Sequence, residues 1–117
     1  MWSISTADAP SSAFHKYQRN HPNEYASVFA NLQRVKGFLD AGHNLGAFQL
    51  SWFRAEGAGV YRIGQTGVPR AYETRLYVCF DAAQQVVHIL GIGDKSSQPR
   101  DVPTARRLAA RILPQEE

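Results

Sequence analysis

Three residues that can hold an anion or exchange a proton lie within one short stretch of the chain. Arg75, His88 and Lys95 belong to "ETRLYVCFDAAQQVVHILGIGDK", residues 73–95, in which two apolar runs flank a polar turn. A plain hairpin would carry Thr or Val at such positions. Arginine and lysine bind anions, and an unperturbed imidazole titrates near ~6.5, which suits proton transfer at neutral pH. This hairpin is therefore the first candidate for a site.

The first run of the hairpin has two unlike faces. Alternation along a strand places one uniformly apolar set toward the helices: Leu76, Val78 and Phe80. The opposite face then carries Arg75, Tyr77 and Cys79. Cys79 has no paired base and is interpreted as an inert thiol.

Strand pairing extends the second face across the hairpin. Turns of two residues (82–83) and of four (81–84) give the same pairing, with Tyr77 opposite His88 and Leu76 opposite Ile89. Because the second run is apolar on both faces, Arg75, Tyr77 and His88 are expected together in a partly sheltered groove.

Two further cations belong to the same face by position. In "GVYRI" alternation buries Tyr61 and Ile63 and turns Arg62 outward, and Lys95 lies just beyond the end of the second run. The alternative is a solvated sheet face on which none of these residues has a function.

The elements that must position these residues follow an α+β order. A brief edge strand is expected at residues 2–5, and a short helix at 6–21, capped by Thr6 or Asp8. Residues 23–42 predict an amphipathic helix with this apolar stripe: Tyr25, Val28, Phe29, Leu32, Val35 and Leu39. Strands are expected at 48–54 and 59–64, then the hairpin, then a helix capped by Asp101. The expected fold is a small, mostly antiparallel sheet with helices packed on one face.

Composition limits the classes of protein. The 117 residues suit a single domain (1–117), and 44% hydrophobic with 20% charged residues argues against wholesale disorder. A net charge of +3 permits a polyanionic partner. The single cysteine excludes an internal disulfide, and the sequence has no metal-ligand spacing or cofactor motif, so neither a metal nor a cofactor is expected. Without a signal peptide or membrane span, the expected location is the cytoplasm.

This order of elements, with "GVYRIG", "ETRLYVCFD" and "VVHILGIGDKSSQPRDV", resembles the RelE/ParE superfamily of toxins from type II toxin–antitoxin pairs. The ending "GDKSSQPRDVPTARRLA" is especially similar to the HigB-like branch. The resemblance covers nearly the whole chain. It implies a RelE-like fold with the order strand, helix, helix and three strands, followed by a C-terminal helix.

The resemblance also implies an activity. Ribonuclease members bind the scissile phosphate with basic residues on the central strands and after the last strand, and the matching positions are Arg62, Arg75 and Lys95, with Arg100 beyond. His88 and Tyr77 are placed like the acid and base groups of some members, which gives His88, Tyr77 and Arg75 as the catalytic set. The implied protein is a metal-independent endoribonuclease that inhibits translation by cutting mRNA at the ribosome. Its implied partners are mRNA, the ribosome and a cognate antitoxin.

Two alternatives stay open within the resemblance. The ParE side of the superfamily inhibits DNA gyrase and does not cut RNA, although it generally lacks these basic and histidine groups. A degenerate domain would bind only an antitoxin.

Overall fold

The structure is a computed structural model that describes residues 1–47, 49–69 and 72–114. The chain is an α+β domain, as expected. Its elements, in order, are β1 (Ser3–Ser5), α1 (Ser11–Asn20), α2 (Pro22–Asp40), the short 3-10 helix η1 (Leu45–Ala47), β2 (Phe53–Gly57), β3 (Val60–Gly64), β4 (Thr74–Asp81), β5 (Val86–Asp94) and α3 (Gln98–Ile112).

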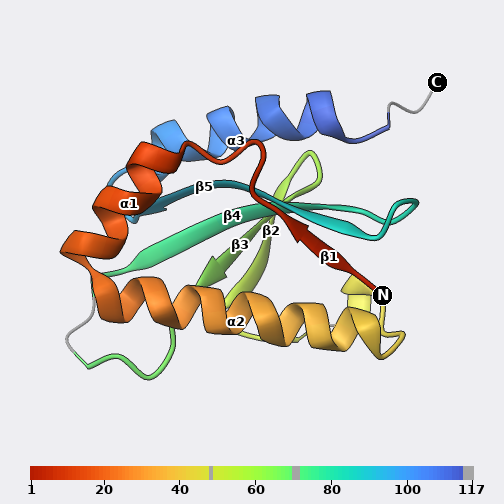
Figure 1. Cartoon of the computed structure of the whole chain (residues 1–117), viewed down its shortest axis with the longest axis horizontal. Helices are drawn as coiled ribbons and strands as arrows, with labels where there is room; N and C mark the ends of the chain where they lie inside the picture. Colours follow the sequence, from red (N-terminus) through yellow and green to blue (C-terminus); the bar gives the residue numbers. More distant parts are fainter. Residues whose placement is uncertain (48, 70–71, 115–117) are drawn as a thin grey trace.

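The strands form one sheet of five in the order β1-β5-β4-β3-β2 (Figure 1). Antiparallel pairs join β2 to β3, β3 to β4 and β4 to β5, whereas β1 runs parallel to β5 at the edge. The expectation of a mostly antiparallel sheet with an N-terminal edge strand is confirmed. Among the described helices, none is both long and apolar enough to cross a membrane.

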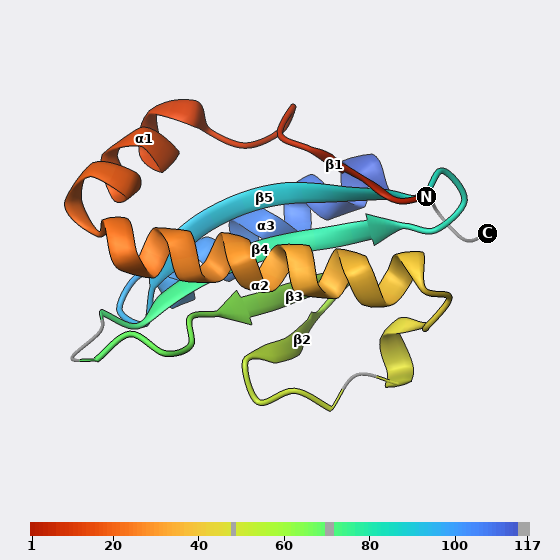
Figure 2. The same ribbon diagram turned by 60° about the horizontal axis from the view of Figure 1, so that its bottom comes forward.

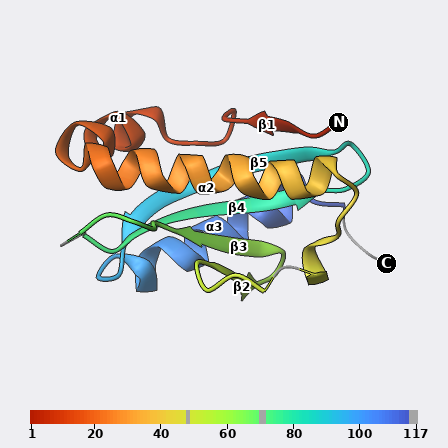
Figure 3. The same cartoon turned by 90° about the horizontal axis from the view of Figure 1, so that it is seen from below.

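The helices cover both faces of the sheet. α1 and α2 lie on one face and α3 on the other, as the view from below shows (Figure 3). The prediction that all helices pack on one face is therefore wrong. The physical reason is that the second face also carries buried side chains, which the apolar stripe of α3 covers: Val60, Tyr77, Cys79 and Leu90, under Val102, Ala105 and Ala109.

The face under α2 holds the larger core. Val28, Leu32 and Val35 are fully buried at the expected helical spacing. They belong to one cluster with the apolar set of β4, Leu76, Val78 and Phe80, which are 0%, 0% and 8% exposed. The predicted packing of this strand face on the long helix is confirmed, and Figure 2 shows α2 lying along the sheet.

The hairpin register differs from the prediction by two residues. The turn comprises residues 82–85, so that Asp81 pairs with Val86 and His88 lies opposite Cys79. Beyond an irregularity at Leu90, Tyr77 lies opposite Gly91 and Leu76 opposite Ile92. The predicted pairs of Tyr77 with His88 and of Leu76 with Ile89 are therefore wrong, because the turn closes at Gln85, whose φ is +55°. Tyr77 and His88 still share a face.

Element boundaries also differ from the sequence-based ones, most clearly at three elements. The strand expected at 48–54 begins only at Phe53, since the preceding residues turn and the carbonyl of Leu50 accepts from the N–H of Phe53; Phe48 lies outside the described residues. α1 begins after Pro10, so neither Thr6 nor Asp8 caps it. α3 begins three residues before Asp101, whose carboxylate instead accepts a hydrogen bond from the hydroxyl of Ser97.

Candidate functional site

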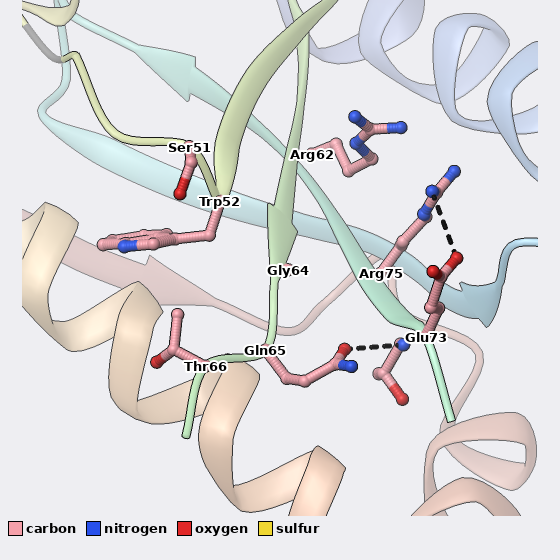
Figure 4. Close-up of a pocket in the computed structure, with 9 residues that line it drawn as sticks. Ser51, Trp52, Arg62, Gly64, Gln65, Thr66, Glu73 and Arg75 are labelled. Carbon is pink, nitrogen blue, oxygen red and sulfur yellow. Dashed lines mark hydrogen bonds and ion pairs between the residues drawn. The ribbon is translucent and has the colours of Figure 1, made fainter. Parts of the chain in front are cut away.

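Two arginines are neighbours on the α3 face of the sheet. Arg62 on β3 pairs with Tyr77 on β4, and Arg75 lies two residues from Tyr77, so the arginines are diagonal neighbours with Cα atoms about 7–8 Å apart. Their side chains are only 20% and 17% exposed. Both line a groove of about 330 Å³ (Figure 4), which also involves Gln65, Thr66 and Glu73. The prediction that Arg62 and Arg75 share a sheet face is confirmed, but this face is partly covered by α3 and is not open to solvent.

A carboxylate lies near each of the two guanidinium groups. A nitrogen of Arg62 lies 3.3 Å from a carboxylate oxygen of Glu56 and donates to the side chain of Gln98, also at 3.3 Å. Arg75 lies 3.8 Å from the carboxylate of Glu73. Because a guanidinium has five N–H donors, each arginine keeps donors that can bind an anion in the groove.

Lys95 joins this arrangement through a second hollow of about 600 Å³ beside α3. Arg75 lines both this hollow and the first groove. Arg62 on β3, Arg75 near the start of β4 and Lys95 just after β5 thus follow one path.

The second hollow contains a cation that the sequence did not single out. Arg106 of α3 lines it and donates two hydrogen bonds to the backbone carbonyl of Glu56. Glu56 and Gln98 were missed as well. The sequence signal for Arg106 was its position next to Ala105 on the flank of the apolar stripe of α3, where a side chain borders the buried surface.

Tyr77 lies beneath these cations, and its hydroxyl is in an unusual environment. The residue is fully buried, and its hydroxyl has no hydrogen-bond partner among the described residues. Burial, with the nearby Asp101 carboxylate as a smaller cause, raises the pKa of Tyr77 to about 12. The phenol therefore stays protonated near neutral pH, so it can donate a hydrogen bond but cannot act as a base.

Replacing Tyr77 with phenylalanine should not destabilise the fold. A buried hydroxyl without a partner carries a desolvation cost, so its removal is expected to leave the free energy of unfolding unchanged or raise it by up to about 1 kcal/mol. Urea unfolding of both proteins measures this difference. A loss of more than about 1 kcal/mol would mean that the hydroxyl has a stabilising partner in solution.

His88 lies apart from the arginines. Its position opposite Cys79 places it two residues further along the sheet than predicted, and it lines neither the groove nor the second hollow. Its nearest charged group is Asp8, whose carboxylate oxygen is 3.9 Å from Nδ1. Cys79 beside it is fully buried, and burial raises the pKa of its thiol to about 12, so it is unreactive near neutral pH.

Arg100 is exposed and lines a different hollow, together with Lys16 and Tyr72. The structure thus brings together Arg62, Arg75 and Lys95, buries Tyr77 beneath them without access to either hollow, and separates His88 and Arg100 from them. In the described ranges, no group of three or more His, Cys, Asp or Glu side chains could hold a metal ion.

Comparison with known proteins identified no relative of this chain. No protein-family model matches the chain, and no curated protein or solved structure matches it.

Proposed function

We propose that this chain is the toxin of a type II toxin–antitoxin pair with a RelE-like fold, and that it cleaves mRNA. The observation that carries the proposal is a pair of partly buried arginines, Arg62 and Arg75, which lie on adjacent strands and line one groove. Guanidinium groups in such a position suit a phosphodiester, which they can bind through several N–H donors. Two features also support this class: the opening order of one strand and two helices, and the "GDKSSQPRD" segment, which runs from the end of β5 into the first turn of α3. The order departs from the implied one after α2, where four strands follow instead of three.

The proposed reaction needs no metal. The 2′-hydroxyl oxygen of RNA bonds to its own 3′-phosphorus, and the bond from phosphorus to the 5′-oxygen of the next nucleotide breaks. The products are a 2′,3′-cyclic phosphate and a 5′-hydroxyl, which takes its proton from solvent. Arg62 and Arg75 neutralise the charge that develops on the phosphate oxygens, and Lys95 holds the neighbouring phosphate.

A base must accept the proton of the 2′-hydroxyl. His88 lines neither hollow, whereas Glu73 lines the groove beside Arg75 and its side chain is 58% exposed. We therefore assign this role to Glu73 rather than to His88.

Two substitutions by glutamine test that assignment. Glu73→Gln removes the base and should lower cleavage by about 10²-fold, while His88→Gln should leave the rate within about two-fold of the wild type. Rates are measured on a mapped transcript in a translation extract, with thermal unfolding as a check on folding. The reverse pattern would return the acid–base role to His88.

The proposed function itself is tested by induced expression in a bacterial host with primer-extension mapping of transcripts. We expect growth arrest and new 5′ ends within translated messages, both suppressed by the cognate antitoxin. Intact transcripts after growth arrest would overturn the ribonuclease proposal.

One observation favours a ParE-like binder of DNA gyrase as the second candidate. The predicted acid–base pair, Tyr77 with His88, is not assembled, and both groove arginines are ion-paired with carboxylates. A binding toxin needs the surface but no proton transfer. DNA damage with intact transcripts would identify it, and a chain without any toxicity would be a degenerate antitoxin-binding domain.

A further inference from the structure

A separate hollow of about 470 Å³ opens between α1 and the first turn of α3. Lys16 and Asn20 contribute one wall from α1, and Arg100 contributes the other from α3. Tyr72, directly before the groove residues Glu73 and Thr74, also lines it. The hollow and the arginine groove therefore adjoin at the start of β4.

Three aromatic rings are in contact beside this hollow. The imidazole of His21 contacts Tyr17, at a centroid distance of 5.0 Å and a tilt of 47°, and stacks on Tyr72, at 4.5 Å and nearly parallel. Tyr72 is nevertheless 48% exposed. Since His21 covers one face of the Tyr72 ring, a further ring can stack only on the other face.

A hydrogen bond and a ring contact hold Tyr72. Its backbone N–H donates to the carboxylate of Glu24 at 3.1 Å, and its ring stacks on that of His21. An aromatic ring that is fixed in this way loses little conformational freedom when a second ring stacks on it.

The hollow is lined by two cations, Lys16 and Arg100, and by two carboxylates that are hydrogen-bonded within the protein, those of Asp94 and Asp101. Neither Lys16 nor Arg100 forms an ion pair with any residue that the structure describes. The carboxylate of Asp94 accepts hydrogen bonds from Ser96 and Ser97, and that of Asp101 accepts from Ser97. Bonding to Ser96, followed by that to the Ser97 N–H, lowers the pKa of Asp94 and keeps it ionised.

We propose that this hollow is a subsite in which an unpaired nucleobase stacks on Tyr72, while Lys16 and Arg100 contact the adjoining phosphates. Proteins that bind single strands combine aromatic faces with a cationic path in this way. A base inside a duplex has both faces occupied by its neighbours, so the ligand is single-stranded. The subsite rests on the proposed function, since the strand continues from here into the groove of Arg62 and Arg75.

The test measures binding without cleavage. A short, fluorescein-labelled single strand of 2′-deoxynucleotides lacks the attacking hydroxyl, and its affinity is followed by fluorescence anisotropy. Tyr72→Leu keeps apolar bulk without a π face and should weaken binding roughly ten-fold. Tyr72→Phe is the matched control, which keeps the ring and should bind within about two-fold of the wild type. Binding to a duplex of the same sequence should not change in either variant.

A salt titration tests the two cations. Lys16→Gln and Arg100→Gln should each lower the slope of log affinity against log salt by about one, whereas Arg107→Gln, an exposed arginine of α3 that does not line the hollow, should not.

The possible results of these experiments distinguish the proposed subsite from the proposed ribonuclease activity. Tyr72-dependent binding of the single strand with intact transcripts in cells supports the subsite and rejects the ribonuclease. Equal affinities of Tyr72→Leu and the wild type overturn the subsite even if transcripts are cut. Absence of single-strand binding by the wild type also overturns it.

Discussion

Replacing Arg75 with alanine is expected to lower RNA cleavage by about 10³-fold and to abolish growth arrest on expression. Arg75 lines both the groove and the second hollow, so its loss removes the cation that joins them. A donor that stabilises developing charge is typically worth about 10²- to 10³-fold in rate, and here the same residue also holds the ground-state phosphate. Cleavage of a mapped transcript in a translation extract gives the rate.

Arg54→Ala is the matched control for this prediction. Arg54 lies opposite Arg62 on β2, but it is exposed and lines neither hollow. The control should keep its activity, and both variants should keep the wild-type melting temperature within a few degrees, because an ion pair such as that of Arg75 with exposed Glu73 contributes about 0–1 kcal/mol. An Arg75→Ala protein that remains fully toxic would remove Arg75 from the mechanism.

Replacing Gly93 with alanine is expected to destabilise the fold by roughly 3 kcal/mol. A Cβ atom at Gly93 would overlap the carboxylate of Asp101 and the hydroxyl of Ser97. These two groups bond to each other where the end of β5 leads into α3, and the Ser97 hydroxyl also accepts from the N–H of Asp94. The added methyl group must break these bonds or move the start of the helix.

Gly91 offers the control on the same strand and the same sheet face. A Cβ atom there would meet nothing within 4 Å. Thermal unfolding should show a fall of roughly 10 °C or more for Gly93→Ala and a change of only a few degrees for Gly91→Ala. Equal melting temperatures of the two variants would mean that the Asp101 and Ser97 side chains rearrange at little cost.

Sequence periodicity predicted the parts of the fold that depend on one element at a time. The buried stripe of α2, with Val28, Leu32 and Val35, follows from helical spacing alone. The two faces of β4 follow from alternation, and that is why Arg62 and Arg75 were expected on the same side.

The relations between elements were harder to predict. The apolar stripe of α3 indicates that this helix packs against the sheet. It does not specify against which face of the sheet the helix packs. The position of His88 depended on the turn, and a non-glycine residue with positive φ, Gln85, gives no clear signal in the sequence. The irregularity at Leu90 then changes every pair beyond it. The arginine half of the site was therefore predictable, whereas the histidine half was not.

The parallel pairing of β1 with β5 has a consequence for the order of folding. It joins the two ends of a long loop: the amino group of Met1 donates to the side chain of Gln85, 84 residues away in sequence. Closing such a loop is entropically costly, and three paired residues offset little of that cost. We therefore expect β1 to pair with β5 only after the hairpin has formed and after the folding transition state has been passed. Substitutions in β1 should then mainly accelerate unfolding and hardly slow folding, so the N-terminal strand determines how long the folded state lasts rather than how fast it is reached.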